Sequence, residues 1–180
     1  MIYAVFSTAM GYSGIVFGDN EPALRAIKIY LPSSKSFIER AIRHEYGAAN
    51  EIEKALPRLC SLVRDFLEGN DVTIPFEFVD PSVCYSFQLK VLKAEREVPR
   101  GTVASYSWVA KKIGSGAVRA VGSALARNPF PIVVPCHRAV RSDGSLGGFQ
   151  GGLEMKRRLL ELEGVQFDSR GRVTSCILRP

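Results

Sequence analysis

The side chains with the clearest chemical potential are Cys136 and His137, which stand next to each other at the end of an apolar run. Phe130–Val134 has the composition of a buried β-strand, and Pro135 ends this run directly before the cysteine. A cysteine attacks as the thiolate, so its ordinary pKa of about 8.5 must be lowered by a neighbouring base or cation for fast reaction at neutral pH. Neighbouring side chains of an extended segment point to opposite faces, so we expect His137 to reach the thiol through a turn or a bridging water. Spacing alone leaves two interpretations open: a catalytic cysteine, and an inert buried thiol beside a structural histidine.

The remaining cysteines and histidines do not form a recognisable metal site. The chain has 4 cysteines without any C-x-x-C pair and only 2 histidines. Zinc sites normally draw on closely spaced cysteines and histidines, so we expect neither a metal nor a cofactor. His44 lies between charged neighbours and is expected on an exposed face.

Charge is distributed unevenly along the 180 residues. Residues 1–80 contain 8 Lys and Arg against 11 Asp and Glu, whereas residues 81–180 contain 16 against 7. The second half is therefore strongly basic, which favours a polyanion such as nucleic acid as its partner, with a solvated basic surface as the alternative. An ordinary globular composition, 46% hydrophobic and 23% charged, excludes a disordered or fibrous protein.

The first half has a mixed pattern of strands and helices. An alternating or β-branched pattern predicts a hairpin of Ile2–Thr8 and Gly14–Phe17, and further strands over 26–31 and 72–79. Apolar residues at helical spacing predict helices over 34–42 and Glu51–Leu67, with Pro57 as a candidate break in the second.

The second half is predicted to be helical. A linker at Asp80–Cys84 precedes an amphipathic helix over Tyr85–Glu95, and two short helices follow over 105–113 and Ala117–Arg127. The glycine-rich turn between the last two makes them a helix-turn-helix candidate.

The helix over Ala117–Arg127 has unusually small side chains. Val118, Val121 and Leu125 are expected to form its buried stripe, whereas the small residues Ala120, Gly122, Ser123 and Ala124 have little capacity to read bases by hydrogen bonds. The helix is suited to close backbone approach with weak sequence preference. Tight packing inside a core is the alternative.

Five separated motifs together resemble one protein family. Pro135-Cys136-His137-Arg138-Ala139-Val140 resembles the PCHRV active-site signature of the O6-alkylguanine-DNA alkyltransferases, the methylated-DNA–protein-cysteine methyltransferases. The other similar segments are Val98–Tyr106, Arg119–Leu125, Asn128-Pro129 and the Gly144–Gly164 stretch. The resemblance covers residues from about 85 to 164. It implies an α+β or α/β protein of two small domains: a ribonuclease H-like mixed domain at 1–80 and, at 84–180, a helical domain with the helix-turn-helix and the active-site cysteine.

The resemblance assigns catalytic roles to four residues. Cys136 would accept the alkyl group and His137 would remove the thiol proton through water. Glu163 would orient the imidazole; without the resemblance it is an ordinary solvated charge near a helix end. Tyr106 would donate a hydrogen bond or proton to guanine N3 as general acid.

The resemblance also assigns a DNA surface and a base pocket. Arg119 would fill the gap left by a flipped nucleotide. Asn128 would tie the recognition helix, Ala117–Arg127, to the active-site strand, Phe130–Val134. The DNA-binding set is Arg119, Ala120, Gly122, Ser123, Asn128 and Arg138. The base-pocket set is Cys136, Ala139, Phe149, Gln150 and Gly151. Gln150 departs from the family, in which many relatives have a small hydroxyl residue there.

The implied activity is that of a methylated-DNA–protein-cysteine S-methyltransferase. The protein would flip O6-alkylguanine, mainly O6-methylguanine and also O4-methylthymine, out of duplex DNA and transfer the alkyl group irreversibly to its own cysteine, once per molecule. The expected partner is double-stranded DNA, with no membrane and no obligate protein partner, and the protein is expected to be a cytoplasmic, nucleoid-associated monomer. The alternatives are a non-catalytic sensor of alkylated DNA, a helix-turn-helix regulator and, least well supported, a cysteine hydrolase.

Overall fold

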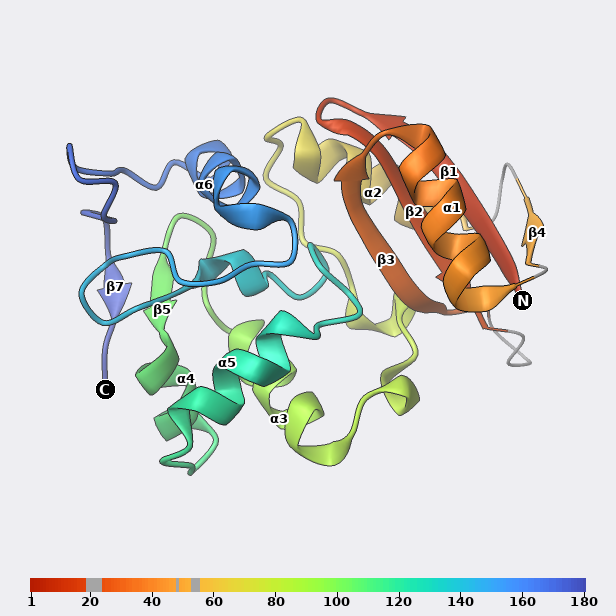
Figure 1. The fold of residues 1–180 in the computed structure, drawn as a ribbon. Coiled ribbons are helices and arrows are strands. Elements are labelled where there is room, and N and C mark those ends of the chain that lie inside the picture. The colour runs from red at the N-terminus through yellow and green to blue at the C-terminus, as the bar shows by residue number, and fades with distance from the viewer. Residues whose placement is uncertain (19–23, 48, 53–55) are drawn as a thin grey trace. The chain divides into compact units, whose positions relative to one another are not determined.

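The computed structural model describes residues 1–18, 24–47, 49–52 and 56–180, and the chain forms two compact units. The first comprises Met1–Val83 together with Pro129–Val133, and the second comprises Cys84–Asn128 and Val134–Pro180. Mixed α/β architecture, expected from the sequence, is confirmed (Figure 1). The short segment Pro129–Val133 groups with residues more than forty positions earlier, which sequence patterns do not indicate.

The first unit is built on a four-stranded sheet in the order β3-β2-β1-β4. Strands β1 (Ile2–Thr8), β2 (Gly11–Phe17) and β3 (Ala26–Ser33) are antiparallel, and β4 (Asn50–Glu51) is parallel to β1. Helix α1 (Lys35–Tyr46) lies across the sheet (Figure 1) and packs Ile38 and Ile42 against Val16. The expected hairpin, third strand and helix are thus present.

Two predicted elements of the first unit differ from the structure. Helix α2 spans Pro57–Leu67, with Pro57 in its first turn, and Glu51 belongs to β4; residues 53–55 of the predicted helix lie outside the described part of the chain. A proline lacks the N–H that an interior position requires, so it starts the helix instead of interrupting it. Over residues 72–79 the expected strand is replaced by irregular backbone and the 3-10 helix η1 (Phe76–Phe78), because Pro75 cannot donate to a sheet ladder. A second 3-10 helix, η2 (Pro81–Val83), follows it.

The second unit combines a helical cluster with a small parallel sheet. Helices α3 (Ser86–Glu95), α4 (Tyr106–Lys112) and α5 (Val118–Ala126) pack against one another, and α4 and α5 form the expected helix-turn-helix. Strand β5 (Val103–Ser105) lies between β6 (Ala139–Val140) and β7 (Ile177–Leu178). Helix α6 (Gly152–Leu162) packs Leu160 into the core of this unit.

The expected strand over Phe130–Val134 is not formed. Its apolar residues are buried as expected, but the backbone turns, and Ile132 has a φ of +75°. A β-branched residue rarely adopts this conformation, so surrounding packing must impose it. Cys136 therefore follows a turn rather than a strand.

Helix α3 has a polar residue at each end of its buried stripe. The stripe runs through Gln88, Val91, Leu92 and Glu95 at helical spacing. Glu95 is 0% exposed, and neither carboxyl oxygen has a hydrogen-bond partner. Burial raises the pKa of this carboxyl to about 8, although the charges of Lys156 and Arg138 act in the opposite direction. The folded protein therefore holds Glu95 in its protonated, neutral form at neutral pH.

We predict that Glu95→Gln stabilises the protein at pH 7.5 but not near pH 4.5. Below the ordinary pKa of 4.5, the carboxyl is protonated in both folded and unfolded chains. As the pH rises toward 8, only the unfolded chain ionises freely, so the wild type loses about 2 to 4 kcal/mol that the amide variant keeps. Urea unfolding at both pH values, followed by the fluorescence of the single tryptophan, Trp108, measures this difference.

Glu97→Gln is the matched control, because that carboxylate is exposed and pairs with Lys112 on the surface. Its effect should stay below about 1 kcal/mol at either pH. An equal effect of Glu95→Gln at both pH values would show that the buried carboxyl does not titrate as stated.

Candidate active site

Cys136 opens a one-turn 3-10 helix, η3 (Cys136–Arg138), in which Cys136 and His137 are both buried. The residue is 4% exposed, and its Sγ accepts a hydrogen bond from Asn128 Nδ2 at 3.2 Å. Burial raises the pKa of the thiol to about 11, although the Asn128 hydrogen bond acts to lower it. Because the neutral thiol is the stable form at pH 7, attack by this sulfur requires a base that removes the proton during the reaction.

His137 is the base that the fold supplies beside this thiol. Its ring is 1% exposed, and Nε2 lies 2.8 Å from Glu163 Oε1. Burial lowers the pKa of His137, while Glu163 acts in the opposite direction. The imidazole is thus neutral at pH 7, donates its Nε2 proton to the carboxylate and has Nδ1 as its basic nitrogen. The predicted link between His137 and Glu163 is present, and the 3-10 turn replaces the extended geometry considered from the sequence.

Arg138 holds Glu163 from the other side. Its Nε donates to Glu163 Oε2 and one terminal nitrogen donates to Oε1, both at 2.8 Å, and the other terminal nitrogen donates to the Val98 carbonyl at 2.6 Å. Burial by itself would raise the pKa of Glu163, but the hydrogen bonds and charges of His137 and Arg138 bring it to about 2. The guanidinium is engaged inside the protein, so its surroundings do not support the expected DNA contact. We assign Arg138 to the positioning of Glu163.

Tyr106 begins α4 and extends toward the loop before α6. Its hydroxyl is 3.4 Å from the carbonyl oxygen of Gly148. A Cβ atom at Gly147, where φ is +67°, would lie 2.8 Å from the same hydroxyl, so only glycine fits there. Burial, reinforced by Glu95 and Cys136, raises the pKa of Tyr106 to about 12. The phenol therefore stays protonated at neutral pH, as a hydrogen-bond donor or general acid must.

Lys156 is a site residue to which the sequence pattern assigned no role. It is 0% exposed, and its ammonium donates to the carbonyls of Ala139 at 2.6 Å, Gly148 at 3.3 Å and Leu146. Nζ also lies 5.8 Å from the centre of the Tyr106 ring. Burial lowers the pKa of Lys156 to about 8. The helical spacing of the sequence could have indicated its burial, because Lys156 lies in the buried stripe of α6 together with residues 159 and 160.

Asn128 connects the end of α5 to the cysteine. Besides its contact with Sγ, Nδ2 donates to the Val134 carbonyl at 3.0 Å, and the residue is fully buried. Its backbone carbonyl accepts a hydrogen bond from Gln150 Nε2 at 2.8 Å. The expected tie between the recognition helix and the cysteine segment is therefore observed, together with a direct contact to the sulfur that the sequence did not indicate.

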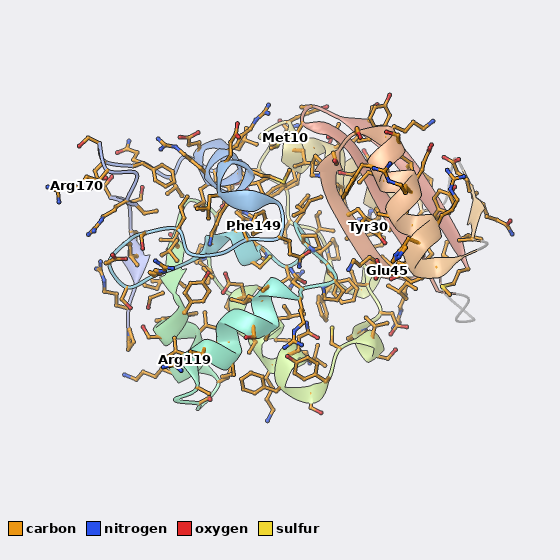
Figure 2. The ribbon with its side chains drawn as sticks, viewed as in Figure 1. Met10, Tyr30, Glu45, Arg119, Phe149 and Arg170 are labelled. Atoms are coloured by element: carbon orange, nitrogen blue, oxygen red, sulfur yellow. The ribbon has the colours of Figure 1, made fainter. Side chains whose placement is uncertain are left out.

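A cavity of about 560 Å³ opens next to α5. Figure 2 shows Arg119 on α5 and Phe149 in the loop that leads into α6, and both elements contribute residues to the lining. The lining residues are Tyr106, Val118, Arg119, Gly122, Ser123, Ala126, Arg141, Gly147, Gly148, Phe149 and Gln150. Of the predicted pocket residues, Phe149 and Gln150 belong to this lining. Cys136 and Ala139 are buried, and Gly151 is the N-cap of α6.

The small face of α5 is directed outward. Ala120 and Ser123 are exposed, and a Cβ atom at Gly122 would meet nothing within 4 Å, so packing does not require a glycine there. The interpretation of these residues as core-packing residues is wrong, except for Ala124, which is buried. Val118 was expected in the buried stripe but is 39% exposed, because it stands in the first turn of the helix, beyond its packed face. Arg119, also exposed, lies beside it.

The described residues, 1–18, 24–47, 49–52 and 56–180, contain neither a metal-binding cluster nor a membrane-spanning helix. Over these ranges, no group of three or more His, Cys, Asp or Glu side chains is arranged to hold a metal ion. In the same part of the chain, no helix has the length and apolarity needed to span a membrane.

Known proteins are similar to this chain in sequence and in fold. Residues 86–165 match the family model of the 6-O-methylguanine DNA methyltransferase, DNA-binding domain. The methylated-DNA–protein-cysteine methyltransferase of Methanothermobacter thermautotrophicus is 44% identical over 124 residues, which cover 69% of this chain and 70% of that protein. The corresponding protein of Methanopyrus kandleri is 50% identical over 110 residues, covering 59% and 82%.

Solved structures extend the likeness over both units. The crystal structure of Mycobacterium tuberculosis OGT in complex with DNA matches with a TM-score of 0.74 and 28% identity, covering 91% of this chain and 92% of that chain. The O6-methylguanine-DNA methyltransferase of Pyrococcus kodakaraensis gives a TM-score of 0.74 at 26% identity, covering 91% and 100%. With its buried Cys136, His137 and Glu163 in one constellation, the chain belongs to the methylated-DNA–protein-cysteine methyltransferase family.

Proposed function

We propose that this protein repairs O6-alkylguanine in duplex DNA by transferring the alkyl group to Sγ of Cys136. The observation that carries the proposal is the hydrogen-bonded series Arg138, Glu163 and His137, which ends at the residue that follows the buried Cys136 in the chain. Burial keeps the imidazole of His137 neutral, and this series fixes its tautomer, as the base of an activated nucleophile requires. A non-catalytic sensor would have no use for it.

The transfer is a direct displacement. As the thiol proton moves through water to Nδ1 of His137, a sulfur electron pair forms the bond to the alkyl carbon. The bond between that carbon and O6 breaks, and its electron pair remains on the guanine. Tyr106 donates a hydrogen bond or proton at N3 and neutralises the developing charge. The product is a thioether, and no group of the site can reverse its formation, so each molecule acts once.

The exposed small face of α5 supports a duplex as the substrate. Close backbone approach suits minor-groove binding, and the exposed side chain of Arg119 would take the place of a flipped nucleotide. Basic residues of the second unit would hold the phosphates without reading sequence, so affinity should fall steeply with salt. The same chemistry would extend to O4-methylthymine, which also presents an alkylated exocyclic oxygen.

Incubation with duplex DNA that contains one O6-methylguanine should add a single methyl group to the Cys136 peptide, with at most one methyl per protein molecule. Peptide mass spectrometry measures the transfer, and the peptides of Cys84 and Cys176 provide unmodified internal controls. Cys136→Ala should abolish transfer and retain DNA binding. If the wild type acquires no methyl group at Cys136 but binds the duplex, the sensor function replaces the transferase.

Asn128→Ala should slow transfer by about three- to tenfold at pH 7.5, because loss of one hydrogen bond to the sulfur removes about 1 kcal/mol of thiolate stabilisation. The pH dependence of iodoacetamide labelling at Cys136 should move upward by somewhat under one unit. Asn128→Asp should have a larger effect, because it adds a negative charge beside the sulfur. The exposed Asn70→Ala is the control, and an unchanged labelling profile in both Asn128 variants would contradict this role.

Arg119→Ala should slow repair of duplex DNA by about tenfold or more, because the variant cannot fill the gap that flipping leaves. Transfer from free O6-benzylguanine, which needs no flipping, should change by less than about threefold. Single-turnover rates on both substrates test this, with the exposed Arg158→Ala as the control for loss of one positive charge. Equal losses on duplex and free base would reject the proposed role of Arg119.

A further inference from the structure

The cavity beside α5 has two walls that come from separate parts of the second unit. One wall is α5, through residues such as Arg119 and Ser123, and the other is the loop Gly147–Gln150. Under the proposed function a flipped base enters this cavity, and the distance between these walls would then set the width available to the base and its alkyl group. Any contact that joins the loop to α5 therefore affects the size of the alkyl group that the pocket accepts.

Gln150 makes such a contact. Its side-chain Nε2 donates to the backbone carbonyl of Asn128 at 2.8 Å, and Asn128 is the second residue after α5 ends. We propose that Gln150 acts as a strap between the two walls, which holds the pocket narrow and favours small alkyl groups over bulky ones. This inference rests on the proposed function, since it concerns the substrate of the same site.

The wall at α5 is held firmly without the strap. Gln88 on α3 is 4% exposed, and its Nε2 donates to the carbonyls of Ala124 at 3.2 Å and Arg127 at 2.9 Å. The Asn128 side chain is fixed in turn by the Val134 carbonyl and the Cys136 sulfur. The end of α5 therefore forms a rigid point to which a loop can be attached.

The loop has less support of its own. Lys156 holds the carbonyls of Leu146 and Gly148, so the loop is anchored where it begins. Beyond Gly148 the chain passes through Phe149 and Gln150 to Gly152, where α6 begins with a φ of +83°. Glycines on both sides allow this segment to move, and the Gln150 hydrogen bond limits its movement away from α5. The strap thus joins this segment to the end of α5, which Gln88 holds.

The strength of the strap sets the expected effect. A neutral hydrogen bond that is partly shielded from water changes an equilibrium by about three- to tenfold. Without this hydrogen bond, conformations in which the loop Gly147–Gln150 lies farther from α5 become more populated. The wider pocket then admits a benzyl group more readily and holds a methyl group less well for in-line attack. The ratio of the two transfer rates is therefore the quantity to measure.

Three variants distinguish the effect of the Gln150 hydrogen bond from the effect of the size of the side chain. Gln150→Ala removes both the side chain and the hydrogen bond. Gln150→Glu keeps the size but replaces the donor with a carboxylate, which the Asn128 carbonyl repels. Gln166→Ala, at an exposed position of the same unit, is the matched control.

Single-turnover transfer to Cys136 is measured with two duplexes, one with O6-methylguanine and one with O6-benzylguanine. We expect the benzyl-to-methyl rate ratio to rise about three- to tenfold in both Gln150→Ala and Gln150→Glu and to stay unchanged in Gln166→Ala. An unchanged ratio in Gln150→Ala would overturn the inference. A raised ratio in Gln150→Ala but not in Gln150→Glu would also overturn it, because bulk rather than the hydrogen bond would then control size. Failure of the wild type to alkylate Cys136 from either duplex would instead overturn the proposed function.

Discussion

The carboxylate of Glu163 accepts hydrogen bonds from His137 and from two nitrogens of Arg138 in a place that solvent hardly reaches. A buried carboxylate is tolerated only when such partners replace its hydration, and loss of one partner leaves an uncompensated charge that costs about 3 to 5 kcal/mol. This arrangement fixes the tautomer of His137, and burial keeps the imidazole neutral, so that it can accept the proton of Cys136. Arg138 also reaches the Val98 carbonyl, which links the carboxylate to the segment that follows α3.

Side-chain amides connect the recognition helix to the nucleophile. Gln88 satisfies carbonyls at the end of α5, Asn128 donates to the sulfur, and Gln150 joins the pocket loop to Asn128. Gln88 and Gln150 donate to backbone carbonyls at or just beyond the end of α5, so the same bonds stabilise the fold and position the site. A displacement of α5 on DNA would therefore act directly on the residue that holds Cys136, whose buried thiol depends on its neighbours for reactivity.

Two buried ionisable groups near the site reduce the stability of the fold. Lys156 and Glu95 are both fully buried, and the burial lowers the pKa of the amine and raises that of the carboxyl. Lys156 is compensated by three carbonyl acceptors, which it draws together around the loop that lines the pocket. The Glu95 carboxyl has no hydrogen-bond partner, so it reduces stability where the unfolded chain would ionise. Buried polar groups of this kind are commonly retained where function opposes stability.

The sequence by itself determined the order of most elements, the basic second half, the identity of Cys136, His137 and Glu163 through a family signature, and the small face of α5. These features depend on local patterns: periodic burial, capping residues and contiguous motifs. The prediction from the sequence is wrong where long-range packing decides the backbone conformation. Phe130–Val134 is the example, because its apolar composition fits a strand although the tertiary structure forms a turn. Only the tertiary structure placed Arg138 on Glu163, Asn128 on the sulfur and Lys156 among the loop carbonyls. The partners in these contacts are from 8 to 25 residues apart, and a buried polar side chain takes whichever partner the packing presents, which no local pattern specifies.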